Sequence, residues 1–277
     1  SILGNVTDND TLAFDRSDNP SFPGTISGTG GLTQLGTGVL TLTGTDSYTG
    51  PTLVSAGTLQ AGAAGAFPGM SAFTVAAGAV LGLNSFNQTI GSLAGAGNVA
   101  LGSATLATGN DGTSTSFSGV ISGTGGLIKI GNGTFTLAGA NTYSGGTFLS
   151  LGTLGIGNSR ALGMGSLTMQ PGTSLQAEGN GFEVANAIFL NGNGNFDTNG
   201  FGLTLSGGIS DGTGQGSLTK IGAGILTLAG QNGYSGQTLV SAGTLQAGAA
   251  GAFPGMSAFT VAAGAVLGLN SFNQTIG

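Results

Sequence analysis

Paired carboxylates are the side chains of this sequence whose spacing is closest to that of a catalytic site. Glu178 and Glu183 lie five residues apart around a Gly-Asn-Gly turn, and Asp197 and Asp211 lie in the stretch that follows. Two carboxylates suffice in principle for glycoside hydrolysis. A solvated turn explains the glutamates more simply, and the few Lys and Arg residues leave little to bind acidic sugars. We therefore expect no catalytic residue.

Other catalytic chemistries are excluded by composition. The chain has no His and no Cys, which removes Ser-His-Asp triads, histidine zinc sites, thiolate nucleophiles and disulfides. No P-loop and no calcium-binding glycine-aspartate repeat occurs. The sequence therefore predicts no cofactor and no metal.

The most charged segment lies near the N-terminus. Asp8, Asp10, Asp15 and Asp18 surround Arg16 there, and a cation site is one interpretation of this cluster. A calcium loop needs a defined alternation of oxygen ligands and a bidentate acid, which this segment lacks. We expect a solvated turn in which the arginine pairs with a neighbouring aspartate.

The three tyrosines of the chain are Tyr48, Tyr143 and Tyr234. Each is followed by Thr or Ser and then by a glycine: Gly50, Gly145 and Gly236. A periodic row of aromatic rings is one form that a glycan-binding platform takes. The alternative is a repeated structural position, in which each ring packs over the next coil and its hydroxyl bonds to the backbone. We favour this structural role.

These tyrosines belong to a motif that occurs three times. Leu32, Leu127 and Leu218 open equivalent stretches, 95 and 91 residues apart, and long periods of this kind indicate stacked repeats. The motif closely resembles the autotransporter-associated β-strand repeat. The second copy fits best, with the following positions matching: Lys129, Gly131, Gly133, Leu137, Gly139, Asn141, Tyr143, Gly145, Thr147, Gly152, Thr153 and Leu154. The first copy departs at Gln34 and Asp46.

The resemblance implies a right-handed parallel β-helix from the secreted passenger of a bacterial autotransporter. It covers essentially the whole chain, which we expect to be one continuous β-solenoid over 1–277. The repeating units would be about 26–120, 121–208 and 209–277, the last one truncated. At 20 to 25 residues per coil, such a rod has about 11 to 14 coils and four coils per unit.

The residues themselves agree with an all-β fold. Glycine accounts for 59 of 277 residues, only 5% of residues are charged, and the mean hydropathy is +0.32, which argues against disorder. Short runs such as VLTLTG at Val39 alternate apolar residues with Thr and are bounded by Gly, as strands are. We expect the glycines at coil corners, where a positive φ suits them.

Residues 52–91 and 238–277 are identical, at an offset of 186 residues. Identity over forty residues indicates duplication or recombination, and an added unit lengthens a solenoid without disturbing its core. An active site is not normally built in this way. The pattern favours a protein whose useful property is its length.

Charge and hydropathy limit the partners. The net charge is −6 and the four basic residues are scattered, so no cluster exists to bind nucleic acid. No apolar run is long enough to span a bilayer. We expect an extracellular shaft or fibre that supports adhesion, aggregation or biofilm formation, with self-association and host, abiotic or glycan surfaces as partners. The alternatives are a glycan-binding or glycan-cleaving module, and an inert stalk for an enzyme elsewhere.

Overall fold

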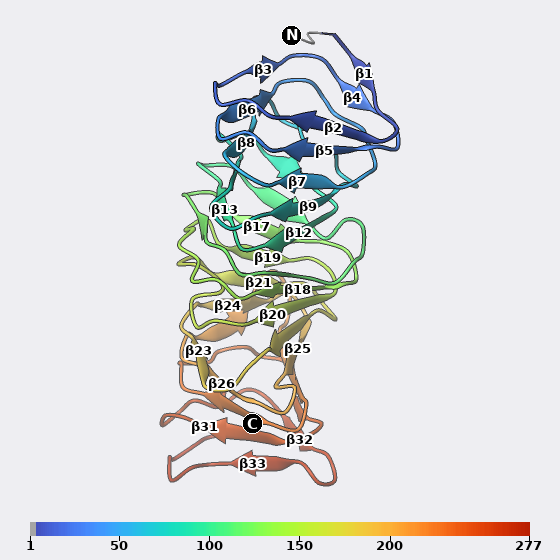
Figure 1. Cartoon of the computed structure of the whole chain (residues 1–277). Coiled ribbons are helices and arrows are strands. Elements are labelled where there is room, and N and C mark those ends of the chain that lie inside the picture. The colour runs from blue at the N-terminus through green and yellow to red at the C-terminus, as the bar shows by residue number, and fades with distance from the viewer. Residues whose placement is uncertain (1–3) are drawn as a thin grey trace. The chain divides into compact units, whose positions relative to one another are not determined.

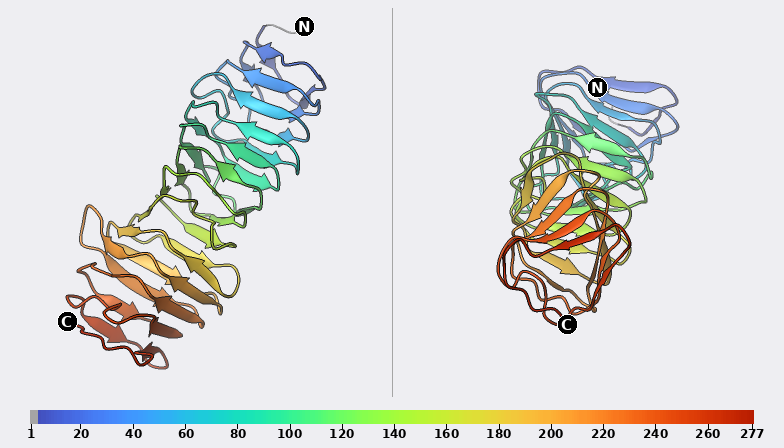
Figure 2. Two further views of the ribbon diagram at one scale, coloured as in Figure 1. Left: turned by 90° about the vertical axis from the view of Figure 1, so that its left-hand side faces the viewer. Right: turned by 90° about the horizontal axis from the view of Figure 1, so that it is seen from below.

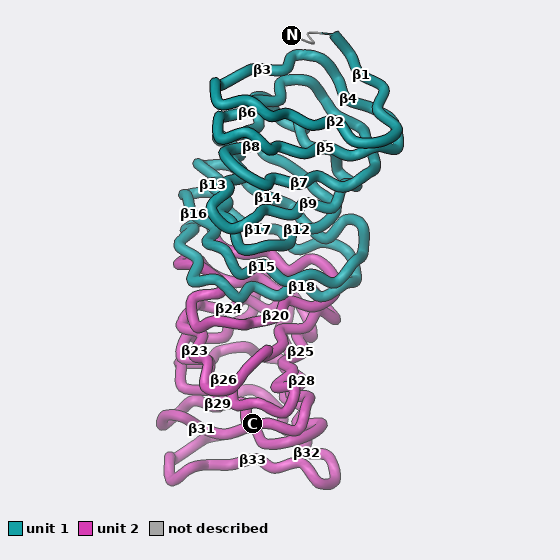
Figure 3. Tube along the Cα trace, in the orientation of Figure 1, with its two compact units in different colours: residues 1–145 teal, residues 146–277 magenta. Residues whose placement is uncertain are grey.

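The computed structural model describes residues 4–277 as β-strands joined by turns, and no helix occurs in that range. The chain forms two compact units, residues 1–145 and 146–277 (Figure 3). Every strand pairing within either unit is parallel, between strands of successive coils. Examples are the pairs Leu12↔Leu32 and Phe196↔Lys220. The fold class predicted from the sequence, a parallel β-solenoid, is confirmed.

Unit 1 arranges its strands on three faces (Figure 1). The first face contains β2 (Thr11–Phe14), β5 (Gly31–Gln34), β7 (Thr52–Val54), β9 (Ala72–Val75), β12 (Ser92–Gly95), β15 (Thr115–Phe117) and β18 (Thr134–Leu137). The second contains β3 (Ser21–Phe22), β6 (Val39–Leu42), β8 (Thr58–Ala61), β10 (Val80–Gly82), β13 (Asn98–Ala100) and β16 (Ile121–Ser122). The third contains the pair β1 (Val6–Thr7) and β4 (Ile26–Ser27), and the row β11 (Gln88–Thr89), β14 (Leu106–Thr108) and β17 (Leu127–Lys129).

Unit 2 has the same three-face arrangement (Figure 2). Its first face contains β20 (Thr153–Ile156), β22 (Ser174–Ala177), β25 (Asn193–Asp197), β28 (Ser217–Ile221), β30 (Thr238–Val240) and β32 (Phe259–Val261). The second contains β23 (Phe182–Val184), β26 (Gly202–Leu205), β29 (Ile225–Leu228), β31 (Thr244–Ala247) and β33 (Val266–Gly268). The third contains β19 (Thr147–Leu149), β21 (Leu167–Met169), β24 (Ile188–Leu190) and β27 (Ile209–Asp211).

Aliphatic ladders form the core of each unit. Alternate residues of a strand point inward, and the parallel register places each inward residue over its equivalent in the next coil. One ladder of the second face in unit 1 consists of Leu40, Leu59, Leu81, Val99 and Ile121. All five side chains are at most 1% exposed. Apolar burial along the stack is therefore continuous, and it supplies most of the stabilisation of the fold.

The motif does not keep to one face. The first copy begins on the first face with β5, but the second begins on the third face with β17. The 95-residue spacing is therefore not a whole number of coils, and the expected four coils per unit is only approximate. Paired residues lie 18 to 24 positions apart, as in Val80↔Asn98 and Phe196↔Lys220, close to the expected coil length. The motif is thus a local stretch of four strands, such as β5 to β8 in the first copy, and it can begin on more than one face.

Candidate functional site

The three tyrosines lie in the core and not on the surface. Tyr48, Tyr143 and Tyr234 are each at most 1% exposed. Burial raises the pKa of Tyr48 and Tyr234 above its ordinary value, which keeps both hydroxyls protonated. Rings so enclosed cannot stack on a sugar, and a tyrosine platform for glycans is therefore wrong for this chain.

A chain of hydroxyl groups links the first tyrosine to the next coil. The Tyr48 hydroxyl shares a 2.6 Å hydrogen bond with Thr52 Oγ1, which shares one of 2.8 Å with Ser71 Oγ. Ser71 Oγ in turn donates to the Gly50 carbonyl at 2.7 Å. The hydroxyl thus reaches the backbone through two side chains, and not directly as expected. In unit 2, Tyr234 contacts Thr238 at 2.6 Å in the same way.

The glycine two positions after each tyrosine is required by close approach of the backbone. A Cβ atom on Gly50 would meet the carbonyl oxygen of Gly30 in the preceding coil, and one on Gly236 would meet that of Gly216. Gly145 meets Gly125 in the same way. None of the three has a positive φ, so the conformational reason expected for corner glycines is wrong at this position.

A buried lysine lies two residues after the leucine that opens the third copy of the motif. Lys220 is 0% exposed, although its side chain ends in an ammonium group. Its Nζ donates to the carbonyls of Ile221, Gly222 and Ala242 at 2.8, 2.7 and 3.0 Å, and lies 2.9 Å from Thr198 Oγ1. Burial lowers the pKa of Lys220 to about 8, and the charge of Asp197 acts in the opposite direction. The ammonium group therefore links its own turn, at Ile221 and Gly222, to Thr198 in the preceding coil and Ala242 in the next coil.

The same position is buried in the other copies. Lys129 is 0% exposed and donates to the carbonyls of Ile130 and Gly131 at 2.8 and 2.7 Å. Gln34 replaces the lysine in the first copy, and its Nε2 donates to the Gly36 carbonyl at 2.8 Å. From the sequence, the lysines were interpreted only as scattered basic residues, and their burial was not predicted. The two-residue spacing from Leu127 to Lys129 was the available signal, because it places both side chains on the inward side of one strand.

Two residues before each tyrosine the chain has an Asn or an Asp. The Oδ1 atoms of Asn141 and Asn232 each accept a 2.8 Å hydrogen bond from the backbone N–H of an isoleucine in the preceding coil. Asp46 accepts the same bond from Ile26 at 2.8 Å. Its second oxygen, Oδ2, is buried without a hydrogen-bond partner in the described structure. Burial raises the pKa of Asp46 to about 7.

The carboxylates considered for catalysis occupy different faces and structural roles. Asp197 lies on β25 of the first face, where its Oδ2 accepts from Gln176 at 2.8 Å. Asp211 lies on β27 of the third face and accepts from the N–H of Gly216 and the hydroxyl of Ser235, both at 2.7 Å. Asp197 Oδ1 also accepts from the N–H of Asn199 at 2.8 Å, so both aspartates stabilise turns. Glu183 lies on β23 of the second face, whereas Glu178 directly follows β22 of the first.

The acidic segment near the N-terminus contains an exposed ion pair. Arg16 Nη2 lies 2.6 Å from Asp18 Oδ2, with side chains 53% and 60% exposed, and the expected pairing with a neighbouring aspartate is confirmed. The pair raises the pKa of Arg16 and lowers that of Asp18. Within residues 4–277, no group of three or more Asp, Glu, His or Cys side chains is placed to hold a metal ion.

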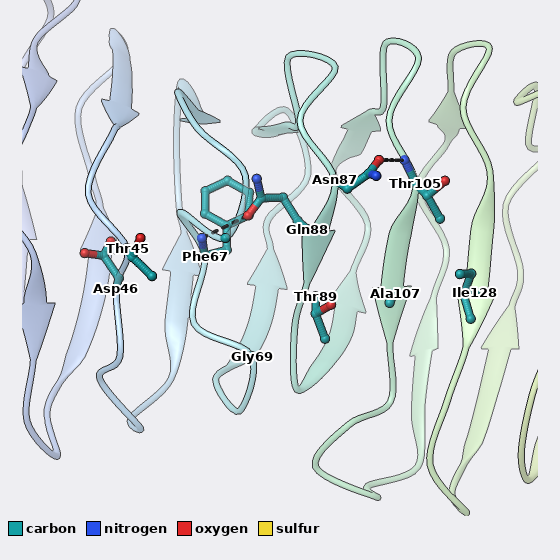
Figure 4. A pocket seen from close by; sticks show the side chains of 11 residues that line it. Thr45, Asp46, Phe67, Gly69, Asn87, Gln88, Thr89, Thr105, Ala107 and Ile128 are labelled. Atoms are coloured by element: carbon teal, nitrogen blue, oxygen red, sulfur yellow. Dashed lines mark hydrogen bonds between the residues drawn. The ribbon is translucent and has the colours of Figure 1, made fainter.

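A shallow groove of about 530 Å³ lies on the third face of unit 1 (Figure 4). Thr89, Ala107 and Ile128 form a ladder across β11, β14 and β17 along it. Phe67 borders the groove but is only 2% exposed. The groove is therefore lined by threonine, asparagine and aliphatic side chains together with Asp46 and Gln88, and its one aromatic ring is buried. Over the described residues, no helix has the length and apolar character to cross a membrane.

Comparison with known proteins places these positions in a family. A model of the passenger-associated-transport-repeat matches residues 32–61, 127–156 and 218–247, which are the three motif copies. The adhesin BmaC autotransporter of Brucella suis biovar 1 (strain 1330) is 42% identical over 274 residues, covering 92% of this chain. The chain spans 8% of the length of that relative. No solved structure matched the chain.

Three features agree with one another: the parallel coils, the repeated Lys, Asn, Tyr and Gly positions, and the matches along the chain. The three matched stretches contain the buried tyrosines and the buried Lys or Gln position described above. The chain is an autotransporter passenger region built on passenger-associated-transport-repeats.

Proposed function

We propose that this chain is a non-enzymatic, surface-exposed or extracellular part of a bacterial adhesin, and that it acts as a load-bearing and contact-making shaft. The observation that supports the proposal most is that the repeated polar side chains of the motif make hydrogen bonds within the coil stack. The tyrosines and lysines of the motif are buried, and Lys220 and Asn232 donate to the carbonyls of Ala242 and Ala252 in the next coil. They stabilise the stack and leave the outer surface to make contacts.

The similarity to an adhesin supports the adhesive part of the proposal. The relative's name describes it as an adhesin, and adhesion by the present chain is our inference. An outer surface with few charges and many Thr, Ser, Asn and Gly residues has little electrostatic repulsion from host, abiotic or neighbouring surfaces. The mechanism is therefore geometric: stacked coils extend the surface and repeat the same weak contacts.

Beads coated with the 277-residue chain test whether this segment itself adheres. We expect such beads to bind host cells or plastic more than beads coated with a non-repeat protein of matched net charge. Substituting both Asp197→Asn and Asp211→Asn should leave binding unchanged in a folded variant, because neither carboxylate takes part in chemistry. Equal binding by coated and control beads would show that adhesion does not reside in this segment.

A further inference from the structure

The three most exposed large apolar side chains among residues 4–277 belong to methionines. Met70, Met164 and Met256 are 54%, 71% and 81% exposed. They occupy equivalent positions after the three copies of the motif, since Met164 and Met256 lie 94 and 186 residues beyond Met70. The fourth methionine, Met169, is 1% exposed. One exposed thioether therefore accompanies each copy of the motif.

Packing does not require a methionine at these corners. In the corner that contains Met70, Phe67 supplies the buried apolar side chain, and its ring centroid lies 5.4 Å from that of Phe73. In the corner that contains Met164, Leu162 is 1% exposed and has that role. Within each unit a further coil follows the corner, as the pairs β9–β12 and β21–β24 show. The exposure of both methionines is therefore a feature of the corners themselves.

Met70 places its sulfur atom beside an exposed polar side chain. Asn110 Nδ2 donates to Met70 Sδ at 3.2 Å and to the Gly69 carbonyl at 2.9 Å, which engages one lone pair of the sulfur. Met164 borders a shallow pocket with Arg160 and Asn186 and is more exposed. Because susceptibility to oxidation follows exposure, we expect both thioethers to react with a small oxidant, Met164 faster than Met70.

Few other side chains of this chain compete for such an oxidant. The sequence has no Cys, His or Trp, and the three tyrosines are each at most 1% exposed. The exposed methionines are therefore the side chains that a small two-electron oxidant reaches first.

We propose that Met70, Met164 and Met256 are oxidation-sensitive contact residues for an uncharged apolar surface such as polystyrene. Residues 62–71, the corner of Met70, contain no charged side chain, so this corner suits a partner without charge. Methionine is flexible and adapts to irregular apolar surfaces, and repeated weak contacts reinforce one another along a chain. The inference rests on the proposed adhesive function and names residues that make its contacts.

Oxidation by a hydroperoxide, for example hydrogen peroxide, changes this contact. A lone pair of Sδ attacks one peroxide oxygen, so that an S–O bond forms and the O–O bond breaks. The sulfur loses two electrons and the peroxide gains them. The second oxygen takes the proton of the transferred oxygen and leaves as water. The resulting sulfoxide is polar and no longer favours an apolar surface, and methionine sulfoxide reductases reverse the change.

Mass spectrometry of the peroxide-treated 277-residue chain tests the modification. We expect Met164 to be oxidised first and Met70 later, with the buried Met169 at least about tenfold slower than either, because susceptibility follows exposure. Equal rates for Met70 and Met169 would overturn the assignment of the site.

Beads coated with the 277-residue chain test the contact. We expect binding to polystyrene to fall at least about threefold once the three exposed methionines are oxidised, because contacts that act together are lost together. Methionine sulfoxide reductases should restore the binding. Unchanged binding, with all three sulfoxides verified by mass and the fold intact by circular dichroism, would overturn the inference and leave the adhesive function standing. Untreated beads that bind no better than control beads would overturn the adhesive function itself.

Two triple variants separate the thioethers from general oxidative damage. Met70→Leu, Met164→Leu and Met256→Leu together keep apolar side chains that peroxide does not oxidise, so binding should be retained before and after treatment. The corresponding glutamine variant supplies polar side chains of similar length and should bind weakly without any oxidant. All three positions are exposed, so we expect both variants to fold. Loss of binding by the peroxide-treated leucine variant, or full binding by the glutamine variant, would contradict the role of the methionines.

Discussion

Asp46 and Asn232 occupy equivalent positions 186 residues apart, and the side-chain Oδ1 of each accepts a 2.8 Å hydrogen bond from an isoleucine N–H. They differ in the second side-chain atom. Asn232 Nδ2 donates to the carbonyls of Ala252 and Gly230 at 2.6 and 3.2 Å. Asp46 Oδ2 has no partner in the described structure. An ionised carboxylate cannot donate, so the first copy makes this second contact only when Asp46 holds a proton.

Asp46→Asn should stabilise the chain at neutral pH and above. The raised pKa of about 7, against 3.8 for an ordinary aspartate, means that the folded state retains a proton that the unfolded state has lost. The free energy of unfolding therefore falls as pH rises from about 4 to 7. The asparagine should remove this dependence and add about 1–3 kcal/mol at pH 8, the typical cost of an unsatisfied buried polar group. Urea unfolding across this pH range measures both effects.

The reverse change, Asn232→Asp, is the matched control. It should lower the free energy of unfolding at pH 8 and leave it nearly unchanged at pH 4, where the carboxyl is protonated. Equal destabilisation at both pH values would mean that the asparagine acts through packing and not through its donated hydrogen bonds.

Lys220→Gln should be tolerated better than Lys220→Met. Gln34 shows that an amide can bond to the turn carbonyl two residues on, whereas methionine leaves the Ile221 and Gly222 carbonyls unpaired, at about 1–3 kcal/mol. The lowered pKa of about 8, against 10.5, makes the folded state release this proton first. Stability of the native chain should therefore rise between about pH 8 and 10.5. Lys220→Gln should reduce that rise, as followed by urea unfolding; an unchanged pH profile would contradict the assignment.

Gly236→Ala should destabilise unit 2, whereas Gly233→Ala should not. A methyl group on Gly236 would meet the backbone of Gly216, and one on Gly233 would meet no atom within 4 Å. Forcing a methyl group into a packed backbone contact typically costs about 1–3 kcal/mol. Thermal unfolding of the two variants compares them directly, and a similar midpoint for both would show that the coils separate easily at this point.

Tyr234→Phe should cost about 0.5–1.5 kcal/mol, which is the usual contribution of one hydrogen bond. The ring would still fill its buried space, and Thr238 Oγ1 would keep its 2.7 Å contact with Ser257 Oγ. Tyr234→Ala should cost about 3–5 kcal/mol, as large-to-small aromatic substitutions do. If chemical denaturation gave equal losses for both variants, the hydroxyl chain and not the ring would be the main contribution.

The fold could be predicted from two signals that are visible in the sequence itself: the alternation of apolar residues within strands and the repeated motif. Alternation such as that around Leu40 and Leu42 places apolar side chains inward, and the repeated motif indicates stacking. The face on which each copy lies could not be predicted. It depends on the cumulative lengths of many turns, and paired residues lie anywhere from 18 to 24 positions apart.

Residue roles were harder to predict than strands. Lys129 looks like a surface charge until its inward register is known, and its acceptors are backbone carbonyls that leave no sequence signature. Gly50 looks like a turn residue, but its role depends on the distance to Gly30 in the preceding coil. Gly57, with a φ of +58°, is a position where the conformational argument applies. The inward register of the strand decides the role of Lys129, and a contact between coils decides that of Gly50.

Removing one whole period from the chain, displayed on the bacterial surface, tests the central claim most directly. Because the two blocks are identical, deleting residues 52–237 joins Pro51 to Thr238 and recreates the native sequence of residues 1–91 without a scar. Bacterial adhesion would be compared with and without the deletion at equal surface display. If the coil stack contributes reach and contact area, adhesion falls while display is unchanged. Undiminished adhesion at equal display would contradict the account.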